Sequence, residues 1–189
     1  MRALIFGGTF NPVHNGHLFL AEDARRSLGY DAVILVPACI PVHKDPAPVL
    51  APGHRLQMLH LAVDGRPGFI IDDCEIIRGG PSYSIDTVRE LIPRLGILAR
   101  PGFLIGEDLV QGFGTWRDAG SLAREVDLIV ARRSAGEAPG FSFPHRSFAN
   151  TVLPVSSSEI RRRAAEGRTV RFLLPDPVAD YIEANRLYG

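Results

Sequence analysis

The chain has 189 residues, of which 46% are hydrophobic and 22% charged, as expected of a globular protein with a sizeable core. Its 21 basic and 21 acidic residues give zero formal net charge, so the basic excess of a nucleic-acid-binding protein is missing and no nucleic-acid partner is expected. No apolar stretch approaches the roughly 18 residues of a membrane span, so no membrane partner is expected. Two cysteines without motif spacing, and an N-terminus without a signal-peptide core, predict a reduced, cytoplasmic protein.

Short apolar runs alternate with helix-like patterns along the chain. A first strand at 2–6 is followed by a glycine turn and a helix to Leu28, and four more runs have the near-continuous apolar character of strands buried on both faces. These runs are Ala32–Val36, Phe69–Asp72, Gly102–Ile105 and Asp127–Ala131. Apolar residues at helical spacing lie between them, at Leu56, Leu59, His60 and Val63 and at Val88, Leu91, Ile92 and Leu95. The alternation predicts an α/β fold: a single Rossmann-like domain over residues 1–189, with an open, mainly parallel sheet and helices on both faces.

The remaining segments are less regular. Residues 37–52 contain five prolines and are expected to form a loop over the strand ends, and residues 133–147 to form a surface loop. A last strand is expected over 149–155. Two helices follow, over 156–165 and from Pro175 through Arg186.

The segment GGTFNPVHNGH, residues 7–17, is the most informative part of the chain. It joins the first strand to the first helix, and such a turn presents unpaired backbone N–H groups and a helix dipole that attract phosphate. It lacks the Gly-Lys-Ser/Thr of the P-loop and the spacing of the dinucleotide fingerprint. Zinc would need more ligands than His14 and His17 supply. A helix cap without function is the remaining alternative, and two histidines on a glycine turn favour the phosphate site over it.

Two later segments also offer phosphate ligands. Lys44 closes the proline-rich loop after the second strand, where it is either a point charge on a polyphosphate or a solvated lysine. The serines at 156–158 begin a helix whose free N–H groups suit phosphate, and Arg161 shares the face of Ser157 and Ser158. Arg162 and Arg163 are expected to face solvent. Judged from the residues alone, a serine cap with surface arginines is the stronger interpretation.

Three features suit the rest of a nucleotide. The segment Ser82–Thr87 precedes a helix that Ser84 or Asp86 could cap, and its dipole would suit a carboxylate. Asp108 follows a strand end, where an acidic residue can accept hydrogen bonds from ribose or cap a helix. Trp116, the only tryptophan, would either stack on a ligand ring or pack in the core.

Thr9–His17 resembles the T/S-F-x-P-x-H-x-G-H signature of the HxGH nucleotidyltransferase superfamily. Within it, the whole chain is similar to the bacterial nicotinate-nucleotide adenylyltransferases. The segments that follow in that family's order are Pro37–Lys44, Ser82–Thr87, Gly106–Asp108, Trp116 and Val155–Arg161. The sequence departs from the family at Val42, Leu109 and Arg117, where a proline, a serine and an aromatic residue are usual.

The resemblance implies an enzyme that joins ATP and nicotinate mononucleotide to give deamido-NAD and pyrophosphate in NAD biosynthesis. It assigns His14 and His17 to catalysis at the ATP phosphates, with Mg²⁺ delivered by ATP and no metal held by protein ligands alone. It assigns ATP and phosphate binding to Gly8, Thr9, Phe10, Lys44, Gly106, Asp108, Ser157, Ser158 and Arg161. It assigns the nicotinate nucleotide to Asp86, Thr87 and Trp116.

Three alternatives stay open at this stage: an adenylyltransferase for phosphopantetheine, a preference for nicotinamide mononucleotide, and a nucleotide-binding regulator without catalysis. The sequence also leaves the oligomeric state open, and a homo-oligomer is compatible with it.

Overall fold

The computed structural model describes residues 1–42, 49–97, 99–132 and 140–189. Its main sheet has six strands in the order β4-β2-β1-β6-β7-β8, and every neighbouring pair is parallel. The strands are β1 (Ala3–Gly8), β2 (Ala32–Pro37), β4 (Phe69–Ile71), β6 (Gly102–Gly106), β7 (Asp127–Arg132) and β8 (Arg146–Ala149). A separate parallel pair joins β3 (Ile40–Pro41) to β5 (Pro81–Ser82).

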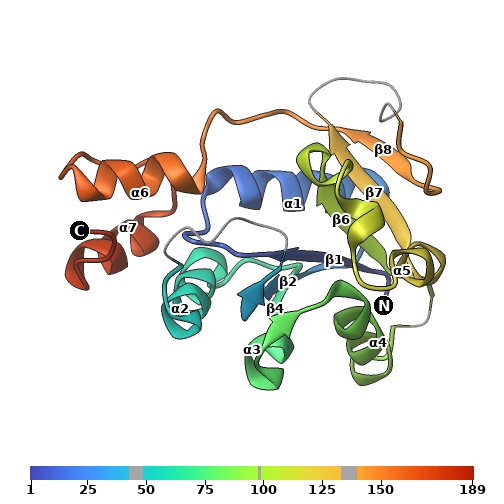
Figure 1. Ribbon diagram of the computed structural model, residues 1–189. Coiled ribbons are helices and arrows are strands. Elements are labelled where there is room, and N and C mark those ends of the chain that lie inside the picture. Colours follow the sequence, from blue (N-terminus) through green and yellow to red (C-terminus); the bar gives the residue numbers. More distant parts are fainter. Residues whose placement is uncertain (43–48, 98, 133–139) are drawn as a thin grey trace.

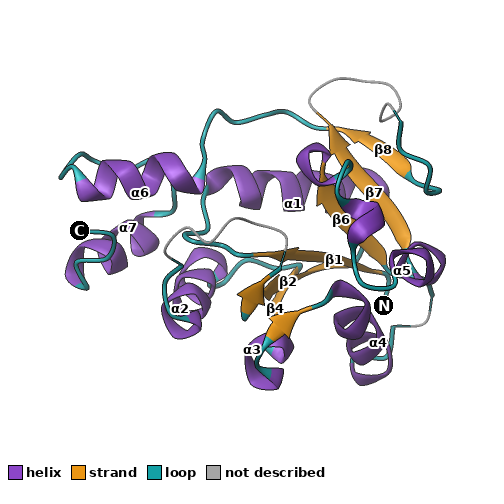
Figure 2. Cartoon of the chain, viewed as in Figure 1, coloured by secondary structure: helices purple, strands orange, loops and turns teal. Residues whose placement is uncertain are grey.

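Helices cover both faces of the sheet (Figures 1 and 2). Successive side chains of a strand point to opposite faces. Leu4 and Phe6 of β1 therefore pack with α1 (Asn15–Leu28), α2 (Pro52–Val63), α6 (Ser157–Ala165) and α7 (Asp176–Ala184). Ala3 and Ile5 pack with α3 (Cys74–Arg78), α4 (Ser84–Arg94) and α5 (Ala119–Glu125). The predicted α/β fold with helices on both faces is confirmed.

The winding of the sheet reverses between β1 and β6. From β1 the chain continues outward to β2 and β4, and it then returns to the other side of β1 to build β6, β7 and β8. The connections on either side of a reversal leave a crevice at the carboxyl ends of the two central strands, where doubly wound proteins bind ligands. The carboxyl ends of β1 and β6 are Gly7-Gly8 and Gly106. The predicted phosphate turn lies at this point.

The expected last strand over 149–155 is wrong. The strand β8 lies earlier and pairs with β7 from Ile129↔Arg146 to Arg132↔Ala149. It is a short edge strand in which only Phe148 is buried, so it has no apolar run to reveal it. Pro154 lies in the segment where the strand was expected, and proline cannot donate to a strand ladder.

The buried face of α2 also differs from the expected one. It consists of Arg55, Met58, Leu59, Ala62 and Val63, while His60 is exposed. An arginine therefore occupies the first position of an otherwise apolar stripe. The final helix ends at Ala184, two residues before the expected Arg186.

Candidate active site

Two adjoining cavities open at the carboxyl ends of β1 and β6. The larger measures about 470 Å³ and the smaller about 110 Å³. Both are lined by Gly7, Gly8 and Thr9 of the first turn and by Gly106 and Leu109 after β6. A ligand that fills both would therefore cross the glycine turn.

The two histidines cap α1 and line the larger cavity. Nδ1 of His14 accepts from the backbone N–H of His17, and Nδ1 of His17 accepts from the backbone N–H of His14, each at 3.3 Å. Their rings stack with centroids 3.7 Å apart, and Phe10 meets His17 edge-on at 5.2 Å. Because each Nδ1 is an acceptor, each neutral ring carries its proton on Nε2. The helix cap is therefore formed by the same two residues that were expected to bind phosphate, so a cap does not exclude that role.

Two positions of the site are glycine because a neighbouring side chain lies close to the backbone there. A Cβ on Gly8 would lie 3.0 Å from the Phe10 ring, and Phe10 itself adopts φ 48°, a left-handed conformation that costs a side-chain-bearing residue energy. A Cβ on Gly106 would lie 2.3 Å from Oδ1 of Asp108, which lines the larger cavity. The glycines let Phe10 and Asp108 lie close to the ends of the central strands.

The start of α6 is held against the histidine turn. The hydroxyl of Ser157 donates to the carbonyl of Pro12 at 2.9 Å, and Nη1 of Arg161 donates to the carbonyl of Asn11 at 2.9 Å. Nη2 of Arg161 donates to the hydroxyl of Ser158 at 3.2 Å. The expected common face of Ser157, Ser158 and Arg161 is therefore correct, and all three line the larger cavity.

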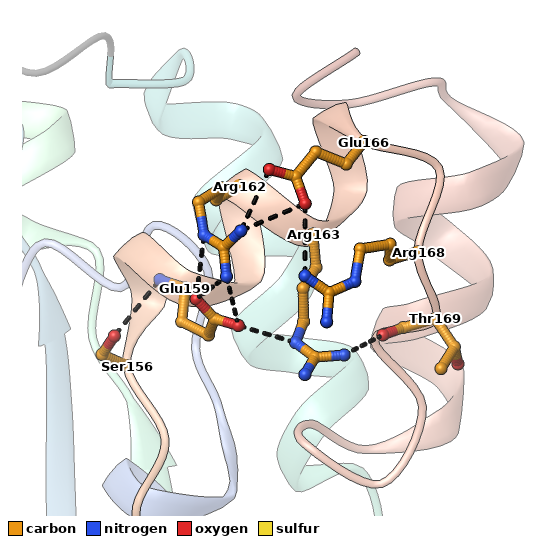
Figure 3. Close-up of polar contacts among 7 residues, drawn as sticks. All are labelled: Ser156, Glu159, Arg162, Arg163, Glu166, Arg168 and Thr169. Atoms are coloured by element: carbon orange, nitrogen blue, oxygen red, sulfur yellow. Dashed lines mark hydrogen bonds and ion pairs between the residues drawn. The ribbon is translucent and has the colours of Figure 1, made fainter.

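The neighbouring arginines belong to a different network, shown in Figure 3. Arg162 lies between Glu159 and Glu166, with contacts of 2.7 and 3.0 Å, and its side chain is 52% exposed. Arg163 pairs with Glu159 at 2.8 Å and donates to the carbonyl of Thr169. Arg162 faces solvent as expected, whereas Arg163 is only 27% exposed and lies further inward than expected.

The smaller cavity has an aromatic wall and a helix start. Trp116 is buried against Phe113 and Phe103, with centroid distances of 5.0 and 6.4 Å, and it also lines the cavity. Ser84, the first residue of α4, lines the cavity too. Tyr83 precedes the helix, and no side chain in the described parts of the chain caps it, so the expected cap at Ser84 or Asp86 is wrong. Of the first turn of α4 only Ser84 lines the cavity, and the backbone N–H of Asp86 already donates to the carbonyl of Tyr83 at 3.1 Å.

Asp86 and Thr87 lie outside the linings of both cavities. Nη1 of Arg117 lies 3.2 Å from Oδ2 of Asp86, and the Arg117 guanidinium lies over the Tyr83 ring at 4.7 Å. Thr87 is buried and donates to Glu75, a residue that does line the smaller cavity. Glu75 thus connects Thr87 to the site, whereas Arg117, the partner of Asp86, lines neither cavity. Lys44 lies outside the described residues.

Arg55 is a site residue that the sequence did not reveal. Its fully buried guanidinium donates to the carbonyls of Thr9, Cys39 and Leu50 at 2.8, 3.1 and 3.0 Å. Burial lowers the pKa of this group, although arginine stays protonated in proteins. Arg55 therefore joins the glycine turn to both ends of the proline-rich loop and places a buried positive charge beside Thr9. The sequence offered one sign of this role: Arg55 lies four residues before Leu59, on the apolar stripe of α2.

Four features meet where the winding of the sheet reverses, between β1 and β6. They are the glycine turn, the histidine cap of α1, the serine–arginine start of α6 and the aromatic pocket. This arrangement defines a nucleotide-binding α/β protein of the nucleotidyltransferase class.

Comparison with known proteins narrows that class. The cytidylyltransferase-like family model matches residues 5–163. A relative from Borrelia garinii subsp. bavariensis, named "Probable nicotinate-nucleotide adenylyltransferase", is 42% identical over all of this chain and 95% of its own length. A relative of the same name from Bordetella pertussis is 40% identical over 97% of this chain and 96% of its own length. The chain belongs to the nicotinate-nucleotide adenylyltransferase family.

A solved structure agrees on the fold. The nicotinic acid mononucleotide adenylyltransferase of Plasmodium falciparum, complexed with NaAD, superposes with a TM-score of 0.76 at 17% identity. The superposition covers 99% of this chain and 97% of that one. No helix in the described ranges of the present chain is long and apolar enough to cross a membrane.

Proposed function

We propose that the protein transfers the adenylyl group of ATP to nicotinate mononucleotide, giving deamido-NAD and pyrophosphate. The observation that carries the proposal is the pair of cavities that share the Gly7–Thr9 turn, one lined by two histidines and the serine–arginine start of α6, the other with an aromatic wall. The membership of the chain in the adenylyltransferase family supports it. ATP would place its phosphates in the larger cavity, and the pyridine ring would occupy the smaller one.

The reaction needs no nucleophile from the enzyme. A phosphate oxygen of the mononucleotide attacks the α-phosphorus of ATP, the bond from that phosphorus to the bridging oxygen breaks, and pyrophosphate leaves. The protein would accelerate this step by holding the two phosphates in line and by stabilising the charge that develops. This agrees with a site built from N–H and guanidinium donors.

Each residue would have a distinct part. The Nε2–H groups of His14 and His17 would donate to phosphate oxygens, and Arg161 with the serines at 157–158 would hold the departing pyrophosphate. Lys44 would add a point charge, as expected from its place in the sequence. Asp108 would accept from ribose hydroxyls. Magnesium would arrive with ATP, bound through phosphate oxygens and water.

The proposal is tested by incubating the protein with Mg²⁺-ATP and one acceptor at a time while pyrophosphate release is followed. Nicotinate mononucleotide, nicotinamide mononucleotide and phosphopantetheine form the panel. Release with nicotinate mononucleotide is expected. Release with phosphopantetheine alone, or with no acceptor of the panel, would contradict the proposal and favour one of the other functions.

Nicotinate mononucleotide is expected to be used at least about tenfold better than nicotinamide mononucleotide, as measured by kcat/KM. The N–H groups at the start of α4 suit a carboxylate, whereas a carboxamide would turn its own donors toward them. A buried donor left unpaired costs ~1–3 kcal/mol, which is roughly a 10- to 100-fold loss. Equal values for the two acceptors would contradict acid selectivity and leave the adenylyl transfer intact.

Trp116→Ala is expected to lower kcat/KM for both acceptors alike, because its indole would stack on either ring. Phe141, which packs against Phe113 from outside both cavities, offers a matched aromatic control. Phe141→Ala should leave kcat/KM close to that of the unmodified protein. A Trp116→Ala variant that loses only one acceptor would show that Trp116 recognises the ring substituent instead.

We also propose a cytoplasmic location, which the free thiols of Cys39 and Cys74 support because reducing compartments keep cysteines unpaired.

A further inference from the structure

Glu75 is a buried carboxyl group that the reaction above does not use. It is the second residue of α3, it is only 6% exposed, and it lines the smaller cavity together with Trp116 and Ser84. An ionised carboxyl at this position would repel a pyridine carboxylate, while a neutral one would not. The charge state of Glu75 therefore bears directly on which ring the cavity accepts.

The hydrogen bonds around Glu75 are compatible with both charge states. Oγ1 of Thr87 lies 2.5 Å from Oε1 of Glu75, 3.3 Å from the carbonyl of Tyr83 and 2.9 Å from Nη2 of Arg78. Ser82 also lowers the pKa of Glu75. When Glu75 is ionised, the hydroxyl of Thr87 donates to it. When Glu75 is protonated, it can donate to Thr87, whose hydroxyl then donates to Tyr83 while still accepting from Arg78.

The electrostatic surroundings favour the neutral form more than water does. Burial raises the pKa of the Glu75 carboxyl, against the lowering effect of its hydrogen bonds with Thr87 and Ser82 and of the charge on Arg78. Arg78 is shared with Glu90 of α4, at 2.5 Å, and the charge of Glu90 raises the pKa of Glu75 further. Within the described ranges, Arg55 of α2 and Cys74 of α3 also interact electrostatically with Glu75, and Asp72, which precedes α3 and pairs with Arg94, acts on Cys74.

We propose that the charge state of Glu75 controls how strongly the small cavity prefers an acidic over a neutral pyridine ring, and that Glu75 takes up a proton when the acidic ring binds. The inference rests on the proposed function, because it places the pyridine ring in this cavity. Protonated Glu75 does not repel the substrate carboxylate. The preference for the acid is therefore highest at pH values below the pKa of Glu75 in the free enzyme. The preference declines as pH rises through that pKa, because the ionised form repels the substrate carboxylate. The carboxamide carries no charge, so its use does not depend on Glu75 in this way.

The test is the ratio of kcat/KM for nicotinate mononucleotide to kcat/KM for nicotinamide mononucleotide, measured across pH. The titrations of ATP and of the mononucleotide phosphate affect both acceptors and cancel in the ratio. We expect the ratio to be constant at low pH and to fall as pH rises through the pKa of Glu75, by roughly tenfold in all, which corresponds to a coupling of about one pKa unit between the two carboxyl groups.

Two variants separate selectivity from structure. Glu75→Gln keeps the shape of the neutral acid, so its ratio should be independent of pH and at least as high as the low-pH ratio of the unmodified protein. Glu90→Gln is the matched control: it removes a carboxylate from the same network but outside the cavity, and its ratio should still fall with pH. A Glu75→Gln variant that keeps the pH dependence, or that loses both acceptors equally at every pH, would overturn the inference.

Calorimetry of the unmodified protein supplies a second measurement that does not depend on the variant folding. Binding of each mononucleotide is measured in buffers of different ionisation enthalpy, which reports proton uptake. More uptake with the acid than with the amide is expected, and equal uptake would overturn the inference. Failure of the proposed function would look different, because neither acceptor would then release pyrophosphate from ATP.

Discussion

His17→Ala is expected to lower kcat by roughly 10²-fold or more, because one preorganised donor to transition-state charge is worth about that much. Its Nδ1 is engaged as acceptor for the backbone N–H of His14, so the proton of the neutral ring is on Nε2, and the residue lines the larger cavity. The ring is held between Phe10 and His14, so its orientation is set before ATP binds. Single-turnover rates with saturating Mg²⁺-ATP and nicotinate mononucleotide measure the effect on chemistry.

The same substitution removes one acceptor of the helix cap, which is worth about 1 kcal/mol, so the protein should remain folded with a modestly lower melting temperature. His60→Ala is the control, since His60 is an exposed histidine on α2 outside both cavities. It should turn over like the unmodified protein. A folded His17→Ala variant with near-normal kcat would remove His17 from the mechanism.

The fold could be predicted from the sequence because its signals are local. A strand buried on both faces of a parallel sheet is a continuous apolar run, as in β2, where all six residues are buried. The glycine turn could be placed because it directly follows such a run, and the serine–arginine face of α6 because helical spacing alone brings Ser158 and Arg161 together. The resemblance to the family then supplied expectations for the roles that these patterns left open.

The features that the sequence did not reveal depend on contacts between distant segments. Arg55 is satisfied by carbonyls 46, 16 and 5 residues away, so nothing beside it in the sequence marks it as part of the site. Glu75 depends in the same way on Thr87, 12 residues later, and on Ser82. The β3–β5 pair brings Ile40 beside Pro81 through strands of two residues each, too short for any periodicity. Helical spacing also misjudged α2, because a buried arginine counts as polar in an apolar pattern.

The remaining large effect is expected at Arg161. Arg161→Ala should lower kcat/KM for ATP by roughly 10- to 100-fold, since a hydrogen bond to a charged group contributes about 1.5–3 kcal/mol. The apparent affinity for the mononucleotide should change far less, because Arg161 lines only the larger cavity. Lys44→Ala is expected to act in the same direction, by the sequence argument for its charge. Steady-state kinetics with each substrate varied in turn distinguish the two effects.

Arg161→Lys should also fail, and the structure gives the reason. The guanidinium donates to the carbonyl of Asn11 through Nη1 and to the hydroxyl of Ser158 through Nη2, so its plane is fixed across the histidine turn and the start of α6. An ammonium group is a compact point charge that cannot keep both contacts and still present a fork to phosphate. Arg162→Ala is the matched control one residue away, because Arg162 pairs with Glu159 and Glu166 on the exposed side of α6 (Figure 3). It should leave ATP kinetics nearly unchanged, since exposed ion pairs contribute little. Equal losses at Arg161 and Arg162 would mean that the charge of the whole helix, and not the fork at Arg161, holds the polyphosphate.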